Sequence, residues 1–203
     1  MSLVFYYAPM STAVTVHWAL EELGIPYDRV DLDLAAGDAR KPGFLALNPN
    51  GKVPLLVHDG VPIFESAAII LHLGETFGVE RDLFPPPGLE RAEALKWVVW
   101  ANVSLGGAVA RFFANTAEQI PADQRNAKAG EIARGEVEKH LGILDADLAG
   151  KTYLVGETFS LVDLHLASYV GWLGMVGFSL DRWRNISRWL RRATERSSHS
   201  RAA

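Results

Sequence analysis

The sequence predicts a chain of two parts, an α/β domain followed by an all-helical domain. Strand-like and helical patterns alternate from the N-terminus to about residue 77. Three consecutive prolines at residues 85–87 then form a stiff, extended connector. Beyond them every apolar pattern has helical spacing. We therefore predict domains over residues 1–77 and 89–203, joined by a linker over residues 78–88.

The first part combines strand signals with two helices. The sequence Asp59-Gly60 between two apolar runs is typical of a hairpin turn, and Gly24 followed by Pro26 ends the first helix. The resulting order, β-α-β and then β-β-α, is that of a thioredoxin-like domain. The expected elements are strands at residues 3–7, 27–34, 53–57 and 61–64, and helices at residues 11–23 and from 65 onward.

The second part has only helical patterns. We expect Gly106-Gly107 to kink the first of these helices and Ser160 to cap the third, with Asp163 completing a capping box. The tail from Ser197 is expected to fray. The expected helices cover residues 90–115, 122–149, 160–175 and 180–196.

Composition excludes several classes of function. The chain has 203 residues, of which 49% are hydrophobic and 22% charged, and its net charge of −4 argues against a nucleic-acid partner. It has no cysteine, so it has no disulfide and no thiolate nucleophile of its own. The histidines are scattered, and we expect no metal. The chain shows no secretory signal, and its longest apolar stretch, at residues 97–103, is interrupted by Asn102. We therefore expect a soluble, cytoplasmic protein with no membrane partner.

Two short segments have both a structural and a functional interpretation. Pro54 at the head of a strand is either an ordinary trans proline or a cis proline that leaves the backbone of Val53 free to pair with an extended peptide. Glu65-Ser66 at the start of a helix is either a cap or a site for the two charges of an amino-acid head group. Taken alone, neither segment decides between the two interpretations.

Three hydroxyl groups lie where the first strand leads into the first helix. Ser11 and Thr12 are either helix caps or donors that stabilise an incoming thiolate at the positive end of the helix. Tyr7, at the end of the strand, is either a packing residue or a third donor.

The segments occur together in an order that resembles the glutathione transferase superfamily over nearly the whole chain. The order of the second and third segments is quite specific, and the last resembles the folding signature of that family's helical domain. The segments are FYYAPMS at residues 5–11, LNPNGKVPLL at 47–56, FESAAI at 64–69 and YLVGETFSLVD at 153–163.

The resemblance implies a role for each matching residue in binding glutathione. Pro54 corresponds to the family's cis proline and Val53 to the residue whose backbone pairs with the cysteinyl part of glutathione. Glu65 and Ser66 correspond to the pair that holds the γ-glutamyl head, and Lys52 is placed to reach the glycyl carboxylate.

The resemblance implies that Ser11 is the first choice for the thiol-activating residue, because it matches the activating serine of the serine-type classes. Thr12 is the second choice, because it aligns with the cysteine of thiol reductase members, and the lack of cysteine disfavours that activity. The implied function is conjugation of glutathione, the co-substrate, to a small hydrophobic electrophile by a homodimer. The alternative is a non-catalytic scaffold or ligand-binding protein of the same fold.

Overall fold

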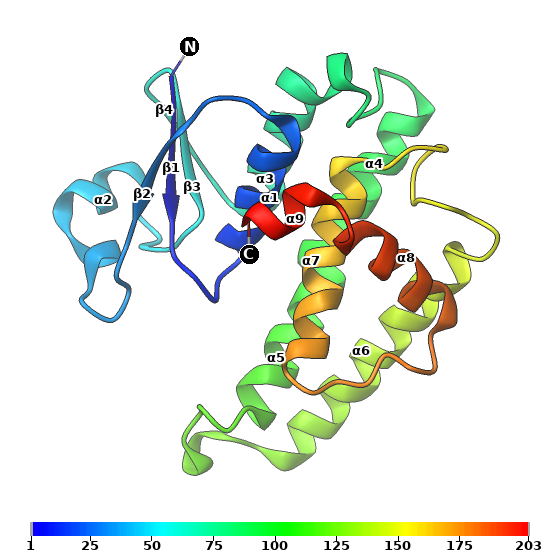
Figure 1. Cartoon of the computed structure of the whole chain (residues 1–203). Helices are drawn as coiled ribbons and strands as arrows, with labels where there is room; N and C mark the ends of the chain where they lie inside the picture. Colours follow the sequence, from blue (N-terminus) through cyan, green and yellow to red (C-terminus); the bar gives the residue numbers. More distant parts are fainter. Residues whose placement is uncertain (1, 203) are drawn as a thin grey trace. The chain divides into compact units, whose positions relative to one another are not determined.

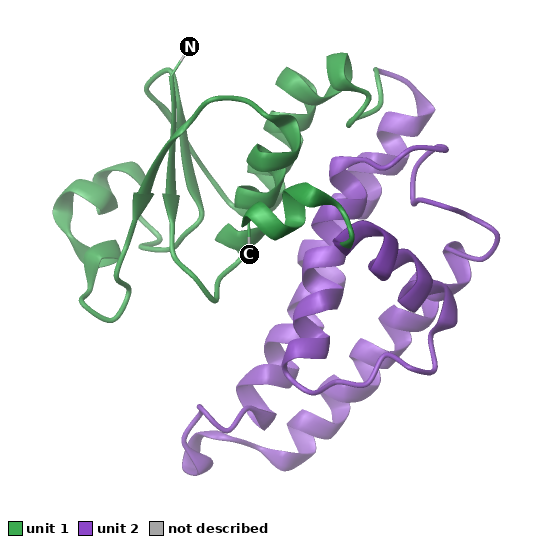
Figure 2. Cartoon of the chain, viewed as in Figure 1, with its two compact units in different colours: residues 1–86, 195–203 green, residues 87–194 purple. Residues whose placement is uncertain are grey.

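The computed structural model describes residues 2–202, which divide into two compact units (Figure 2). The first unit contains the residues up to Pro86 together with those from Glu195, and the second runs from Pro87 to Thr194. The boundary between the two units at Pro86 lies within the predicted linker, residues 78–88. The segment from Glu195 groups with the first unit, whereas the predicted helical domain extended to residue 203.

The first unit is built on a four-stranded mixed sheet in the order β2-β1-β3-β4 (Figure 1). The strands β1 (Leu3–Tyr7) and β2 (Asp28–Asp31) are parallel, whereas β3 (Leu55–His58) and β4 (Val61–Phe64) form the antiparallel hairpin. This topology confirms the thioredoxin-like prediction. The third strand begins two residues later than expected, after the cis Val53–Pro54 peptide.

Helices α1 (Ala13–Leu23) and α3 (Ser66–Leu73) bury apolar side chains in the first unit. The chain ends α1 at Gly24, whose φ of 61° is left-handed and therefore favours glycine. The remaining helical elements of this unit are α2 (Pro42–Leu47), α9 (Ser197–Ala202), the 3₁₀ turns η1 (Asp38–Arg40) and η3 (Val79–Arg81), and the π-helical turn η2 (Gly74–Gly78).

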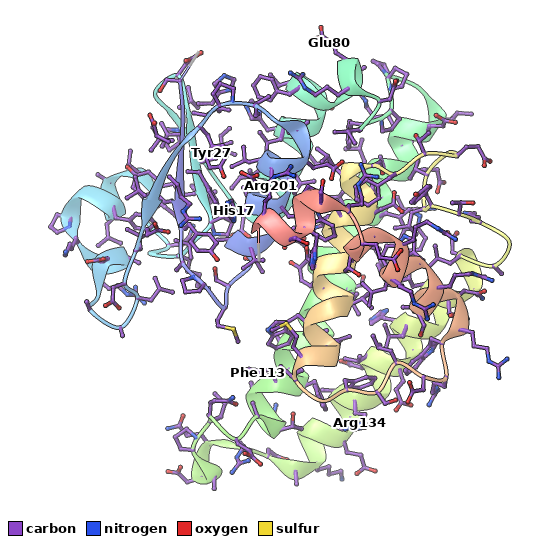
Figure 3. All side chains as sticks on the ribbon, viewed as in Figure 1. His17, Tyr27, Glu80, Phe113, Arg134 and Arg201 are labelled. Atoms are coloured by element: carbon purple, nitrogen blue, oxygen red, sulfur yellow. The ribbon has the colours of Figure 1, made fainter. Side chains whose placement is uncertain are left out.

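The tail predicted to fray is instead bonded to α1 as helix α9. The indole Nε1 of Trp18 donates to Ser198 Oγ at 3.0 Å, and Arg196 forms an ion pair with hydrogen bonds to both carboxylate oxygens of Glu22. Arg201, labelled on α9 in Figure 3, donates from Nε to Glu21 Oε2 at 2.8 Å. Tertiary contacts therefore order a segment whose own sequence is too polar and short to form a stable helix.

The second unit is entirely helical within the described residues. Its main helices are α4 (Leu89–Trp100), α5 (Gly106–Thr116), α6 (Ala127–Asp147), α7 (Leu161–Met175) and α8 (Arg184–Thr194), with π-helical turn η4 (Ala101–Leu105) and 3₁₀ turn η5 (Ala122–Gln124). The irregularity expected at Gly106-Gly107 is the π turn η4 just before them. A Cβ on Gly106 would lie 2.9 Å from the carbonyl oxygen of Ala101 and 3.0 Å from the ring of Tyr169, so glycine is required there.

The capping box at the start of α7 is confirmed, and it extends into a buried network. The carboxylate of Asp163 is fully buried and accepts hydrogen bonds from the N–H groups of Leu154 and Ser160, at 2.9 and 3.1 Å. It also accepts from Trp189 Nε1 at 2.8 Å, which ties α7 to α8. Burial raises the pKa of Asp163, and these donors oppose that rise.

One stretch of helix, residues 89–116, is long and apolar enough by length and composition to cross a membrane, whereas the sequence pattern predicted no such segment. Its inner face buries Trp97, Val98 and Leu105 in the second unit. Its outer face exposes charged side chains such as Glu93 and Lys96 together with the apolar side chains of Leu95, Val99 and Val103.

Candidate functional site

The sheet register brings three of the predicted segments to one edge of the first unit. Tyr6 in β1 pairs with Leu55 in β3, which in turn pairs with Phe64 in β4. The turn after β1, the cis Val53–Pro54 peptide before β3 and Glu65 after β4 therefore all lie at the same end of the sheet. Residues 7–12, 52–54 and 65–66, although far apart in the sequence, form one candidate site.

In the turn between β1 and α1, the hydroxyl group of Ser11 is hydrogen-bonded to backbone groups. Ser11 Oγ donates to the carbonyl oxygen of Ala8 at 2.7 Å and accepts from the N–H group of Ala13 at 3.1 Å. Thr12 is the N-cap residue of α1, but its side chain makes no capping hydrogen bond and is exposed. A hydroxyl group has one hydrogen to donate, and that of Ser11 is already engaged.

Tyr7 belongs to an aromatic cluster behind this turn. Its ring lies 5.4 Å from that of His17 and 6.0 Å from that of Phe5, and the guanidinium of Arg29 lies 5.0 Å from its centroid. His17 is buried, and burial lowers its pKa, although its Nδ1 lies 3.2 Å from the carbonyl oxygen of Ala202. The sequence does not mark His17 as a site residue, because a histidine inside a helical pattern carries no distinguishing signal.

The loop before β3 is held by one buried asparagine. Asn48 Nδ2 donates to the carbonyl oxygen of Lys52 at 2.7 Å, and its Oδ1 accepts from the N–H group of Asn50 at 3.1 Å. Gly51 has a φ of 61° and lies close to the carbonyl oxygen of Ala39, so this position requires glycine. The cis Val53–Pro54 peptide follows, as the family resemblance implied. The ladder begins at Leu55, so the backbone of Val53 lies outside it.

Glu65 has an unusual backbone conformation for its residue type. Its φ of 71° and ψ of 122° place it in a region that residues with side chains rarely adopt. It precedes α3, whose first residue, Ser66, is buried, while Glu65 itself is exposed. Strained residues of this kind cluster at ligand sites, where the surrounding structure maintains them.

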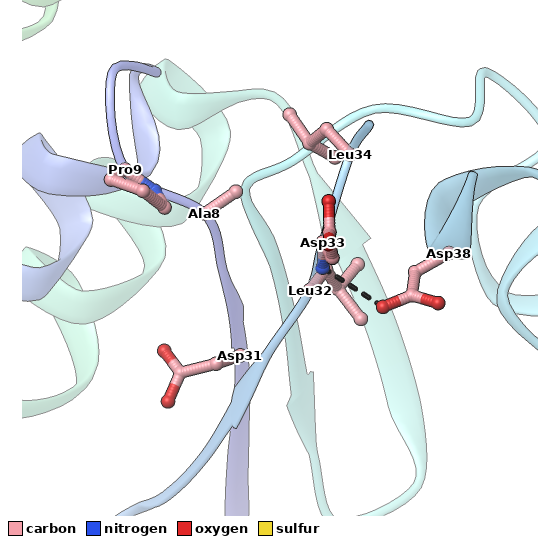
Figure 4. A pocket seen from close by; sticks show the side chains of 7 residues that line it. All are labelled: Ala8, Pro9, Asp31, Leu32, Asp33, Leu34 and Asp38. Carbon is pink, nitrogen blue, oxygen red and sulfur yellow. Dashed lines mark hydrogen bonds between the residues drawn. The ribbon is translucent and has the colours of Figure 1, made fainter. Parts of the chain in front are cut away.

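A cavity of about 480 Å³ lies on the other flank of the turn (Figure 4). It is lined by Ala8 and Pro9, by Asp31 at the end of β2, and by residues of the segment that follows, including Asp33 and Asp38. Asp38 accepts from the N–H group of Asp33 at 2.8 Å, and Asp33 Oδ1 accepts from the N–H groups of Ala35 and Ala36 at 2.9 and 3.0 Å. These carboxylates therefore shape the loop. Across residues 2–202 no three His, Asp or Glu side chains form a group that could hold a metal ion.

Comparisons with known proteins agree with this geometry. Residues 1–75 match the family model of the glutathione S-transferase N-terminal domain, and residues 106–197 match that of the C-terminal domain. The chain is 34% identical to glutathione S-transferase GstB of Escherichia coli strain K12 over 179 residues, covering 87% of this chain and 85% of the relative.

Solved structures show the same fold. The structure of a sphingomonad glutathione S-transferase complexed with glutathione has a TM-score of 0.85 at 29% identity, with 98% of this chain and 96% of that one covered. Ure2p in complex with glutathione has a TM-score of 0.90 at 22% identity, with 100% and 98% covered. The chain therefore belongs to the glutathione S-transferase superfamily and is a glutathione transferase.

Proposed function

We propose that the enzyme conjugates the glutathione thiolate to a small hydrophobic electrophile, with glutathione bound along the sheet edge described above. The observation that supports this most directly is the left-handed backbone of Glu65, at the same end of the sheet as the cis Val53–Pro54 peptide. Turn chemistry does not explain this conformation at a glutamate, whereas a requirement to direct the carboxylate toward a ligand does.

Glu65 and Ser66 would hold the γ-glutamyl head of glutathione. The exposed carboxylate of Glu65 offers a partner for the ammonium group. The N–H groups at the start of α3, beginning at Ser66, offer donors and a positive potential to the α-carboxylate. The ammonium group of the γ-glutamyl head would thus face the carboxylate of Glu65, and its α-carboxylate would face the N–H groups at the start of α3.

Val53 and Lys52 would bind the rest of the peptide. The backbone of Val53 lies outside the ladder and so can pair with the cysteinyl unit as an added strand would. Lys52 is exposed one residue earlier, where its ammonium group can reach the glycyl carboxylate. Pro54 has no N–H group and therefore removes a competing donor at this point.

Thr12 is our first candidate for activating the thiol, followed by Ser11 and Tyr7. Lowering the thiol pKa by about two units requires about 2.7 kcal/mol. A hydroxyl hydrogen bond to the charged sulfur supplies about 1.5–3 kcal/mol, and the N-terminus of α1 adds about 0.3–1 kcal/mol. Thr12 can donate without giving up a capping bond, whereas Ser11 must first release the carbonyl of Ala8.

The test is the thiolate absorbance of enzyme-bound glutathione measured against pH. We expect Thr12→Val to raise the pKa of the bound thiol by at least about one unit while calorimetry shows glutathione affinity largely kept. Ser11→Ala and Tyr7→Phe are the matched comparisons. If Ser11→Ala alone moves the titration, that hydroxyl group is the donor. If the wild type does not bind glutathione, the proposed function is wrong and the scaffold alternative is favoured.

We also propose a cytoplasmic homodimer, by analogy with the family. Leu95, Val99 and Val103 lie four residues apart along one face of the second unit and are 37%, 49% and 71% exposed. Such a stripe can supply part of a subunit interface. Sedimentation at micromolar concentration should give twice the chain mass of 22.3 kDa, and Val103→Asp should weaken the association. A wild-type monomer would contradict this proposal.

A further inference from the structure

Two histidines that are 14 residues apart in the sequence meet in the first unit. His58 is the last residue of β3, and His72 lies in the last turn of α3. Nδ1 of His58 and Nε2 of His72 are 2.8 Å apart, and the planes of the two rings are inclined at 60°. No motif in the sequence marks this pair, because the two residues become neighbours only when α3 packs beside β3.

The pair lies at the end of the sheet opposite to the proposed glutathione site. His58 is paired with Leu3 at the start of β1 and with Val61 at the start of β4. The candidate site segments instead flank Leu55 and Phe64, at the other ends of β3 and β4. Neither histidine therefore has a part in the proposed conjugation reaction.

A hydrogen bond between the two rings is the simplest interpretation of this geometry. Each neutral imidazole has one hydrogen and one ring lone pair. If the hydrogen of His58 is on Nδ1, it bonds to the lone pair of His72. If it is on Nε2 instead, and His72 has its hydrogen on Nδ1, the two facing nitrogens present lone pairs to the same point. Two such imidazole nitrogens are ligands that suit a divalent transition-metal ion.

A carboxylate beside His58 favours the second arrangement. Oδ2 of Asp59 lies 3.6 Å from Nε2 of His58, the ring nitrogen that does not face His72. Metal-binding histidines usually have a carboxylate or a similar acceptor at their other nitrogen, which keeps the hydrogen there and orients the ring. The N–H group of Ser2 donates to Oδ1 of Asp59 at 2.7 Å and so helps to hold this carboxylate in place.

The two rings are also accessible to an ion from solvent. The side chain of His58 is 16% exposed, and His72 is partly exposed. Burial lowers the pKa of His72, and the neighbouring His58 lowers it further, so this ring is neutral at pH 7 and does not have to lose a proton to bind an ion. The nearby carboxylate of Glu75, which opposes this shift, adds negative charge that attracts a cation.

We propose that His58 and His72 form a binding site for one divalent transition-metal ion, which links the end of β3 to the end of α3. The site is independent of the proposed function. Within residues 2–202 no third His, Asp or Glu side chain joins the two histidines in a metal-binding group, so solvent molecules would complete the coordination.

The distance between the two nitrogens indicates which ions the site prefers. With metal–nitrogen bonds of about 2.05 Å, ligands at a tetrahedral angle have nitrogens about 3.3 Å apart, and ligands at a right angle have them about 2.9 Å apart. The 2.8 Å between His58 and His72 is close to the second value. The site should therefore prefer Ni²⁺, which accepts ligands at right angles, over Zn²⁺, which favours a tetrahedral arrangement.

Calorimetry with Ni²⁺, on the full chain without a polyhistidine tag, tests the site. We expect one ion per chain in the wild type and loss of this binding in the double variant His58→Gln/His72→Gln. Because the two rings bind one ion together, each single variant should lose nearly as much affinity as the double variant. His140→Gln, in α6 of the second unit, is the matched control and should bind Ni²⁺ as the wild type does.

Two further measurements report on stability and on the atoms involved. Saturating Ni²⁺ should raise the melting temperature of the wild type and leave that of the double variant unchanged, because the ion binds only the folded site. Asp59→Asn should weaken Ni²⁺ binding about tenfold, as is usual for the partner of a metal ligand. A long-range ¹H–¹⁵N imidazole spectrum of the wild type with Zn²⁺, which is diamagnetic, should identify His58 Nδ1 and His72 Nε2 as the coordinated nitrogens.

Three results would overturn the proposal. The first is a wild type that binds Ni²⁺ no more tightly than the double variant. The second is a pair of single variants that each lose only part of the affinity, as independent histidines would. The third is tighter binding of Zn²⁺ than of Ni²⁺ by the wild type. The imidazole spectrum needs no variant, so it tests the site even if a substitution disturbs folding.

Discussion

Protonation of His165 should make the protein less stable in mild acid. This side chain is fully buried in α7, and its Nε2 lies 2.6 Å from Asn102 Oδ1. Its Nδ1 is buried without a hydrogen-bond partner, so a proton added there would create an unsolvated charge. Burial lowers the pKa of His165 from 6.5 to about 3. The unfolded chain therefore binds this proton at a pH at which the folded chain does not.

The sign and size of the effect follow from linkage. Because the folded pKa lies below the unfolded one, the full stability is present above pH 6.5 and decreases as the pH falls from 6.5 toward 3. At about 1.36 kcal/mol per pH unit, the loss between pH 7 and pH 5 is about 2 kcal/mol. For a chain of this size that corresponds to roughly 4–8 °C in melting temperature.

The assay is urea unfolding at pH 7 and pH 5 in the wild type and in His165→Gln. Glutamine can still bond to Asn102 but does not titrate, so its pH-dependent loss should be about 2 kcal/mol smaller than that of the wild type. His199→Gln is the comparison at a less buried histidine, whose pKa burial also lowers. Equal pH dependence in the wild type and His165→Gln would refute the reasoning.

Three further predictions concern the ligand site, the buried network around Asp163 and the ion pair between Arg196 and Glu22. Glu65→Gln should weaken glutathione binding about tenfold or more in calorimetry, since a charge-assisted bond contributes about 1.5–3 kcal/mol, and circular dichroism should be unchanged. Unchanged affinity would remove Glu65 from the site. Asp163→Ala should cost about 3 kcal/mol or more in urea unfolding, because several buried donors lose their acceptor, and Asp163→Asn should cost less. Arg196→Met should cost about 1–3 kcal/mol, because it leaves the carboxylate of Glu22 without its ion pair, and should expose the C-terminus to carboxypeptidase; a tail as resistant as the wild type would contradict the role given to that pair.

Local patterns in the sequence were sufficient for the order of the elements. Alternation and the Asp59-Gly60 turn predicted the β3–β4 hairpin, and Ser160 with Asp163 predicted the cap of α7. Each of these features is made by residues close together in the chain, so their chemistry can be read without knowing the fold. The site segments were likewise found as short motifs, although their roles remain predictions.

Only the tertiary structure decided which groups are available and which are already bonded. The sequence ranked Ser11 above Thr12, and the hydrogen bond from Ser11 to Ala8 in the folded turn now favours the reverse. The tail looked too polar to be ordered, yet Glu22 and Trp18, far away in the sequence, hold it against α1. Met10 has a left-handed backbone, with a φ of 55°, that no local sequence pattern predicts. In each case the outcome depends on partners brought close by the fold, and periodicity and local propensity contain no information about such contacts.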